Sequence, residues 1–124
     1  SSKEVALPVF DTKNGGARLF KIQDMALDLR KTGNNGLEPN PQRCKPVQLD
    51  SIDIAIIPGI AFDEKAGRLG SGSGRYDRII PKLPATARKV AVAFEDQITD
   101  MVPMESHDKS VDIIITEKRV IYKI

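Results

Sequence analysis

The sequence predicts an α/β fold built around a mainly parallel sheet, and three features of its pattern lead to this prediction. Continuous apolar runs at 52–57, 90–94 and 111–116 have the length and composition of strands that are buried on both faces. A glycine-rich loop and a segment at 76–83 with the pattern of a helix lie between the first two runs. A strand, a helix and another strand in this order are typical of right-handed crossovers, which layer helices over a parallel sheet. A short final strand at 120–124 is expected at an edge of the sheet.

The first 50 residues predict a hairpin, a helix and a long connection. The apolar run Val5–Phe10 and the alternating residues 18–22 flank an Asn-Gly-Gly turn at 14–16, which is typical of a β-hairpin. Apolar residues at helical spacing within 23–31 predict a helix. Residues 32–50 contain several prolines and glycines and have no clear period. Connections of that length usually serve a function or move.

The composition indicates one ordinary globular domain across residues 1–124. Apolar residues make up 40% and charged residues 29% of the chain, and the formal net charge is only +2. So small a charge argues against nucleic-acid or membrane partners, and the sequence shows neither a membrane-spanning run nor a signal-peptide pattern. Cys44 is the only cysteine, so we expect a reducing, cytoplasmic setting in which this thiol is a bystander. We expect a monomer or a weak homodimer.

The loop at 67–74 is the most informative segment for function. It holds four glycines and is bracketed by Arg68, Arg75 and Arg78, with Asp77 just beyond its last glycine. Glycines let backbone N–H groups approach an anion, and a following helix adds a favourable dipole, so this pattern predicts phosphate binding at the carboxyl end of a central strand. The loop matches neither a Walker A motif nor a dinucleotide fingerprint. Taken without its neighbours, its composition also fits a flexible linker.

Two carboxylates, Asp77 and Asp108, are candidate ligands for magnesium, which prefers one or two carboxylates together with phosphate oxygens. The alternatives are a first-turn helix acid for Asp77 and a solvated loop acid for Asp108. As a loop carboxylate facing a cation, Asp77 is expected to add little to fold stability. Asp63 and Glu64 are candidates for shaping the Asp-Glu-Lys-Ala-Gly turn that they begin. Tyr76 could stack on a planar substrate or pack against the core.

Several motifs in a fixed order carry a resemblance to a known family. The most specific is Pro58-Gly59-Ile60-Ala61-Phe62-Asp63, followed by Gly67-Arg68-Leu69-Gly70-x-Gly72-x-Gly74-x-Tyr76-Asp77-Arg78. Further matching segments lie at 3–10, 37–39, 93–97, 103–112 and 116–117. Together they resemble the 5-formyltetrahydrofolate cyclo-ligases, also called 5,10-methenyltetrahydrofolate synthetases.

The resemblance implies a three-layer α/β/α domain and an enzyme that uses ATP and Mg²⁺. Such an enzyme converts a reduced folate, 5-formyltetrahydrofolate, into 5,10-methenyltetrahydrofolate, with ADP and phosphate as by-products. By the same resemblance Arg68 and Tyr76 are catalytic, and Asp77 and Asp108 hold magnesium. The expected cofactor-binding residues are Arg68, Leu69, Gly70, Ser71, Gly72, Ser73, Gly74, Arg75 and Tyr76.

Three positions depart from the family pattern. Ser71 stands where members usually carry Tyr, Arg or His, Ser73 stands where they carry Gly, Lys or Arg, and Arg75 stands where an aromatic is usual. Members also begin earlier, with helices that this chain is expected to lack. The alternative is therefore a non-catalytic nucleotide- or folate-binding relative, or an inactive fragment of the same fold.

Overall fold

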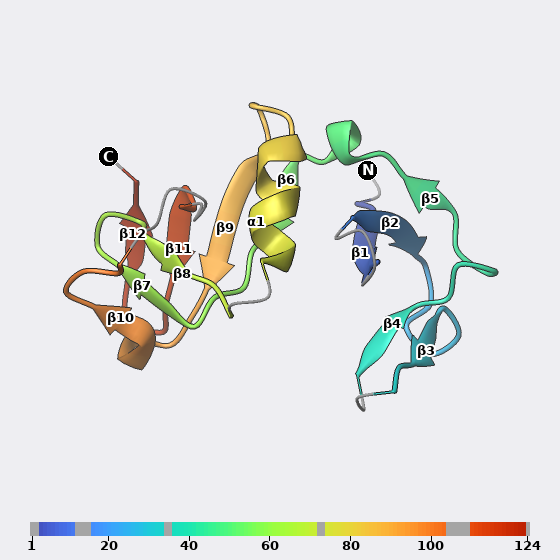
Figure 1. Cartoon of the computed structure of the whole chain (residues 1–124), viewed down its shortest axis with the longest axis horizontal. Helices are drawn as coiled ribbons and strands as arrows, with labels where there is room; N and C mark the ends of the chain where they lie inside the picture. Colours follow the sequence, from blue (N-terminus) through green and yellow to red (C-terminus); the bar gives the residue numbers. More distant parts are fainter. Residues whose placement is uncertain (1–2, 12–15, 34–35, 72–73, 104–109, 124) are drawn as a thin grey trace. The chain divides into compact units, whose positions relative to one another are not determined.

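The computed structural model describes residues 3–11, 16–33, 36–71, 74–103 and 110–123. The chain divides into two compact units, Ser1–Ser51 and Ile52–Ile124, which are described separately below (Figure 1). The single domain expected across residues 1–124 stays a prediction.

The first unit is built from short antiparallel strands. In one sheet β1 (Val5–Phe10) pairs with β2 (Ala17–Ile22), and β2 also pairs with β5 (Pro46–Val47). The strands β3 (Leu29–Lys31) and β4 (Leu37–Pro39) form a second pair, and a short 3₁₀ helix, η1 (Leu49–Ser51), ends the unit. Phe20, Ile22 and Cys44 form its buried cluster. The predicted hairpin is confirmed, although most of its turn lies outside the described residues.

The helix predicted at 23–31 is wrong. In its place the chain makes a turn and then enters β3. The Asp28 carboxylate accepts hydrogen bonds from the backbone N–H of Gln23 and Asp24, both at 2.9 Å, and the Asp24 carboxylate accepts one from Ala26 at 2.8 Å. Aspartate side chains that bond nearby backbone N–H groups offer the chain an alternative to a helix. The bonds from Asp24 and Gln23 also lower the pKa of the Asp28 carboxyl.

The second unit contains the apolar strands that the sequence predicts. They form a four-stranded sheet in the order β12-β11-β9-β6. In it β9 (Arg88–Val92) pairs in parallel with both β6 (Ile54–Ile56) and β11 (Ile113–Ile115), while β12 (Val120–Tyr122) pairs antiparallel with β11 at the edge. The edge position of the last strand is confirmed.

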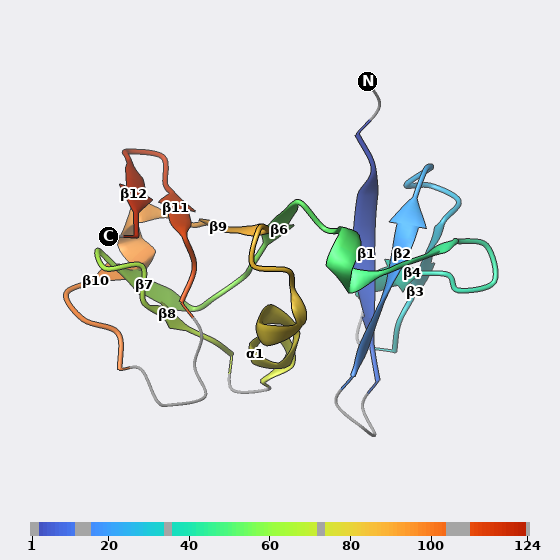
Figure 2. The same ribbon diagram turned by 90° about the horizontal axis from the view of Figure 1, so that it is seen from above.

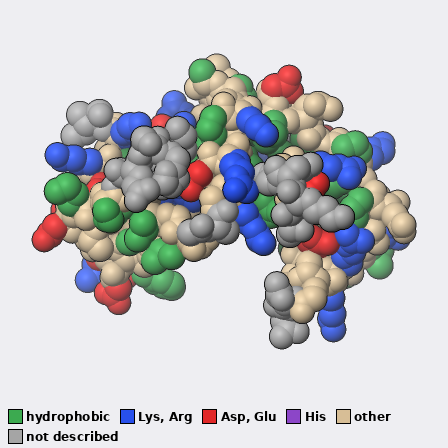
Figure 3. Space-filling model, viewed as in Figure 1, with side chains coloured by type: hydrophobic (Ala, Val, Ile, Leu, Met, Phe, Trp, Pro, Cys, Tyr) green, Lys and Arg blue, Asp and Glu red, His purple; other side chains and the backbone are tan. Residues whose placement is uncertain are grey.

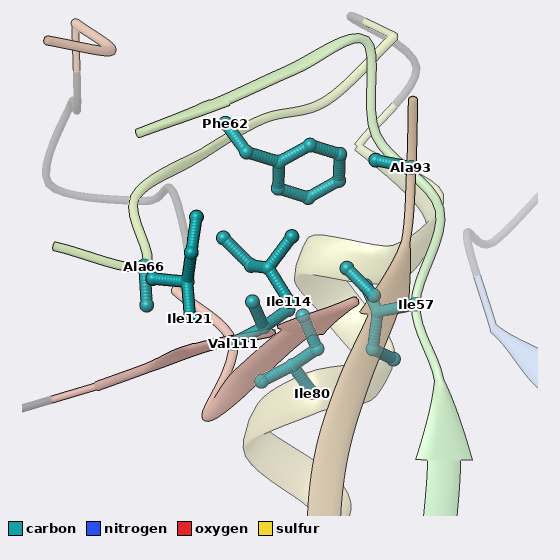
Figure 4. Close-up of a cluster of buried hydrophobic side chains, with 9 residues drawn as sticks. Ile57, Phe62, Ala66, Ile80, Ala93, Val111, Ile114 and Ile121 are labelled. Atoms are coloured by element: carbon teal, nitrogen blue, oxygen red, sulfur yellow. The ribbon is translucent and has the colours of Figure 1, made fainter. Parts of the chain in front are cut away.

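A second, smaller sheet and one short helix complete this unit. The sheet has the order β10-β7-β8, from β7 (Ala61–Asp63), β8 (Arg68–Leu69) and β10 (Ile98–Thr99). The helix α1 (Arg75–Ile79) continues into the 3₁₀ helix η2 (Ile80–Lys82), and a further 3₁₀ helix, η3 (Glu95–Gln97), precedes β10. Figure 2 shows α1 to one side of β6 and β9. Side chains from the sheet, the hairpin and η2 meet in one buried cluster of Ile57, Phe62, Ala66, Ile80, Ala91, Ala93, Val111, Ile114 and Ile121 (Figure 4).

The prediction of a three-layer α/β/α fold is wrong. Within the part of the chain that the structure describes, α1 is the one α-helix and has five residues, and the strands form several small sheets of mixed pairing. The apolar runs did become strands, but the connection from β6 to β9 holds a hairpin, the short helix α1 and the 3₁₀ helix η2, where the fold class requires a full helix. Pro81 is one reason, since it lacks a backbone N–H to continue α1. None of the described helices is long and apolar enough to cross a membrane.

The four-stranded sheet is covered on one face. Ala91, Ile114 and Ile121 point into the buried cluster, and their neighbours along each strand point the opposite way. That opposite face is apolar yet exposed, at Ile54, Ile56, Val92, Ile115, Val120 and Tyr122. The runs are therefore continuously apolar as predicted, although only one side of them is buried.

Asp63 fixes the hairpin between β7 and β8. Its buried carboxylate accepts backbone hydrogen bonds from Lys65 at 3.0 Å, Gly67 at 2.8 Å and Val102 at 2.9 Å. Burial acts to raise the pKa of this carboxyl, but the bonds from Val102, Gly67 and Lys65 and the charge of Lys65 outweigh it, so the pKa lies below its usual value. The proposed role of Asp63 in shaping the turn is confirmed, and the bond to Val102 adds a long-range tie.

We expect Asp63→Asn to lower the free energy of unfolding by about 2–3 kcal/mol. Asparagine has one carbonyl oxygen for three backbone donors, and its amide group would face at least one of them. Urea denaturation measures the change. Asp100→Asn, at an exposed position, is the matched control and should stay within about 0.5 kcal/mol of the parent. Equal stability of the two variants would contradict this role.

The stabilisation from Asp63 should also depend on pH. Because the folded pKa of Asp63 is depressed, its contribution is complete above the unfolded value of about 3.9 and is lost as pH falls through the folded pKa. The difference in unfolding free energy between the parent and Asp63→Asn should therefore be constant above about pH 5 and shrink below about pH 4. Urea denaturation from pH 7 to pH 3 measures this difference, and a constant difference down to pH 3 would rule the linkage out.

Candidate functional site

The glycine loop follows the hairpin strand β8. It passes through Gly70 and Ser71, and the chain then reaches Gly74, whose φ of 72° is in the left-handed region that favours glycine, just before α1. The sequence predicted that the loop would leave a central strand directly. In the structure the hairpin of β7 and β8 lies between β6 and the loop, so the loop begins at the end of β8.

Arg68 is buried at the base of this loop. Its side chain is only 3% exposed. Its Nε donates to the carbonyl oxygen of Pro58 at 2.7 Å, and its Nη1 donates to Oδ1 of Asp77 at 2.7 Å. This one guanidinium therefore ties β8 to the turn after β6 and to the first turn of α1. Its catalytic role stays a prediction.

Asp77 faces Arg68 from α1 with 12% of its side chain exposed. A Cβ on Gly70 would lie 3.2 Å from Nη2 of Arg68 and 3.5 Å from Oδ2 of Asp77, so the loop backbone passes directly over the pair. The expectation that Asp77 adds little to stability does not fit this contact, because losing the carboxylate would leave a buried guanidinium unpaired.

Three successive carbonyls after β6 are held by two side chains. The Nε of Arg68 donates a hydrogen bond to the carbonyl of Pro58, and Nε2 of Gln97 donates to the carbonyls of Gly59 at 3.3 Å and Ile60 at 3.2 Å. The Gln97 Oε1 accepts the backbone N–H of Phe94 at 2.8 Å, which closes η3. Gln97 thus joins two of the sequence motifs across the chain.

Two glycines in the motif are required by packing. A Cβ on Gly59 would lie 2.7 Å from the ring of Phe62 and 3.2 Å from Cγ of Arg68. One on Gly67 would lie 2.6 Å from Oδ2 of Asp63. The contacts of 2.7 Å and 2.6 Å are closer than real Cβ atoms tolerate. The two glycines therefore allow the buried side chains of Phe62 and Asp63 to lie against the backbone.

Tyr76 packs against the buried cluster of the second unit. Burial raises the pKa of its hydroxyl, and the charges of Arg75 and Arg68 act in the opposite direction. Of the two alternatives for this ring, packing is the one that the structure shows. The catalytic role of Tyr76 stays a prediction.

Of the remaining predicted site residues, four are described by the structure and three are not. Ser71 and Arg75 are exposed, whereas Leu69 and Gly74 are partly buried. Lysine and arginine side chains lie in several groups on the face seen in Figure 3, and one group lies over α1. Gly72, Ser73 and Asp108 lie outside the described residues.

Of the two predicted magnesium ligands, Asp77 is the one that lies among the described residues. Within the described ranges, no three His, Cys, Asp or Glu side chains come together as a metal site. Magnesium needs no such cage, because it takes one or two carboxylates and completes its shell with water and phosphate oxygens. The Asp77 carboxylate fits that requirement through Oδ2, which lies beside the loop at Gly70. The metal role of Asp77 and Asp108 stays a prediction.

A further contact joins two motifs that the sequence could not connect. Glu95 pairs with Arg119, with Nη2 to Oε2 at 2.8 Å, and accepts the Thr116 hydroxyl at 2.9 Å. The Glu117 carboxylate accepts the backbone N–H of Glu95 at 2.8 Å. The hydrogen bonds from Arg119 and Thr116 lower the pKa of the Glu95 carboxyl. The matches at 93–97 and 116–117 thus form one structural contact.

A family model and several known proteins match this chain over most of its length. The model of the 5-formyltetrahydrofolate cyclo-ligase family matches residues 1–117. A mitochondrial 5-formyltetrahydrofolate cyclo-ligase of Arabidopsis thaliana is 30% identical over 98% of this chain and 50% of its own length. That of Mycolicibacterium smegmatis is 36% identical over 66% of this chain and 42% of its own. The NMR structure of Aquifex aeolicus 5,10-methenyltetrahydrofolate synthetase has a TM-score of 0.80 and 30% identity, and the match covers 98% of this chain and 59% of that one.

The chain spans about half the length of these relatives. Within that span the family match includes the glycine loop, Arg68 and Asp77. By this match, the chain belongs to the 5-formyltetrahydrofolate cyclo-ligase family.

Proposed function

We propose that this protein converts 5-formyltetrahydrofolate to 5,10-methenyltetrahydrofolate with ATP and Mg²⁺. The observation that carries the proposal is the Arg68–Asp77 pair, which lies directly beneath the glycine loop inside the family-matched segment. This arrangement puts a fixed carboxylate beside a backbone that can approach phosphate closely. A reduced folate in one-carbon metabolism is the substrate class that family membership supports.

The proposed roles follow the loop. The segment 68–76 cradles the ATP phosphates, and its exposed part, including Ser71 and Arg75, faces the folate. Asp77 and Asp108 hold magnesium, which would neutralise phosphate charge when bound. A monomer or weak homodimer in the cytoplasm stays a prediction.

The chemistry suits a site with few reactive side chains. The formyl oxygen of the substrate takes the terminal phosphoryl group of ATP, and ADP leaves. The neighbouring N10 then attacks the formyl carbon, and phosphate leaves as the ring closes. Positioning and charge neutralisation do most of this work, so the protein needs no nucleophile of its own.

A second candidate function is binding of nucleotide or folate without turnover. It is favoured by the serines at positions 71 and 73, by Arg75 in place of an aromatic, and by the match to only half of the relatives' length. Only the first candidate requires turnover of the substrate, so a turnover measurement separates the two.

We expect the chain to form 5,10-methenyltetrahydrofolate from 5-formyltetrahydrofolate and Mg-ATP. The near-ultraviolet absorption of the product measures this reaction. Omitting ATP should abolish the signal. ATP binding by calorimetry without any turnover would favour the binding-only candidate, and the absence of both would contradict the proposed function.

We expect Asp77→Asn to weaken Mg-ATP binding by about 10-fold or more and to lower the free energy of unfolding by about 2–4 kcal/mol. The first change reflects the lost metal ligand, and the second reflects the guanidinium of Arg68 left buried without its carboxylate. Calorimetry and urea denaturation measure the two changes. Asp53→Asn, an exposed aspartate in the same unit, is the control. Unchanged Mg-ATP affinity in the folded variant would remove Asp77 from the metal role.

A further inference from the structure

We propose that Gln97 is a positioning residue for the candidate site, whose side-chain amide holds the turn at 58–60 in the conformation that the base of the glycine loop requires. The inference rests on the proposed function and extends it to a residue that lies outside the predicted site residues.

Gln97 reaches the turn from the next strand of the parallel sheet. It lies in η3, which follows β9, and β9 pairs in parallel with β6, which leads into the turn. The carboxyl ends of parallel strands lie at the same edge of a sheet, where open α/β sheets bind their ligands. The Gln97 side chain therefore joins two strand ends at that edge.

The peptide unit between Gly59 and Ile60 is held from both sides. Its carbonyl accepts a hydrogen bond from Nε2 of Gln97 at 3.3 Å, and its N–H donates to the carbonyl of Leu69 at 2.7 Å. Leu69 is the last residue of β8, directly before the loop at Gly70. Because a peptide unit is planar, a rotation that follows the loss of one bond would also break the other. The Gln97 amide thus secures the bond that ties the turn to the start of the loop.

The same turn positions the guanidinium beneath the loop. The Pro58 carbonyl, one peptide before the unit held by Gln97, accepts a hydrogen bond from Nε of Arg68 at 2.7 Å. Nη2 of this guanidinium faces the loop, because a Cβ on Gly70 would lie only 3.2 Å from it. Displacement of the turn would therefore move the guanidinium relative to a phosphate bound at the loop.

An amide side chain is what the three contacts of Gln97 require. Its Oε1 accepts the backbone N–H of Phe94 at 2.8 Å, while its Nε2 donates to the carbonyls of Gly59 and Ile60. A carboxylate has no donor, so it would keep the first contact and place an anionic oxygen against two carbonyls. This asymmetry separates the two roles that are open to Gln97, closing η3 and holding the turn.

The test uses two substitutions that remove different contacts. Gln97→Glu retains the acceptor for Phe94 and loses both donors, whereas Gln97→Met loses all three contacts. The same two substitutions at Gln48, an exposed glutamine in the first unit, are the matched controls for an added charge and a lost amide. Calorimetry measures Mg-ATP affinity, and NMR hydrogen exchange measures the opening of the bond from the Ile60 N–H. Urea denaturation confirms that each variant is folded at the temperature of the titration.

We expect Gln97→Glu to weaken Mg-ATP binding about 10-fold and Gln97→Met about threefold, because the carboxylate repels the turn carbonyls while the thioether only releases them. Exchange at the Ile60 N–H should rise in the same order, by about 10-fold in Gln97→Glu. Exchange at the Asp112 N–H, which bonds the Lys89 carbonyl, is the internal reference and should stay within about twofold of the parent. Both Gln48 variants should match the parent.

Other outcomes overturn the inference in distinguishable ways. Weaker Mg-ATP binding in Gln97→Met than in Gln97→Glu would mean that Gln97 acts by closing η3. Faster exchange at Ile60 with unchanged Mg-ATP affinity would mean that the turn does not position the site. Unchanged exchange in both variants would mean that Gln97 does not hold the turn. A parent that does not bind Mg-ATP would overturn the proposed function and the inference with it, whatever the exchange rates show.

If Gln97→Glu does not fold, Gln97→Asn supplies the same test. Asparagine keeps the amide group but is one methylene shorter, so it cannot keep all three contacts at their observed lengths. Mg-ATP affinity should fall and exchange at the Ile60 N–H should rise. Values of both that match the parent would overturn the inference.

Discussion

The buried guanidinium of Arg68 is the contact on which the candidate site depends. It joins three segments that regular secondary structure leaves unconnected, namely the strand that carries it, the turn at Pro58 and the helix that carries Asp77. A buried charge is tolerated only when it is paired and hydrogen-bonded, so neither partner can be replaced freely. Gly70 lies close to this pair, because a Cβ there would come within 3.2 Å of Nη2 of Arg68, and Gly59 leaves room for the Phe62 ring and the Arg68 stem.

Side chains that bond to the backbone shape the rest of the site. The Asp63 carboxylate accepts hydrogen bonds from three backbone N–H groups, and the Gln97 amide donates to two backbone carbonyls. The strands around them have only two or three residues each. Strands this short provide few ladder bonds, so the loops must satisfy their own polar groups in other ways. The hairpin therefore has a defined position although little regular structure holds it.

These side-chain contacts mark the limit of what the sequence could predict. Apolar runs and the turn signal placed the strands of the sheet and the first hairpin, because burial and turn geometry are local properties. The helical layers did not appear, since Asp24 and Asp28 can bond the backbone themselves and Pro81 stops α1. The Arg68–Asp77 pair was out of reach for a different reason. Spacing showed that the two residues were near in sequence, but which arginine is buried depends on the turn at Pro58, ten residues away.

The number of arginines around the glycine loop overstates the attraction of the loop for anions. The charge of Arg68 is neutralised within the site by Asp77, so it adds little to the field that a phosphate would meet. Backbone N–H groups of the loop and the exposed side chain of Arg78 can add to that attraction. Exposed charges are screened by salt, whereas the geometry of a buried pair is not.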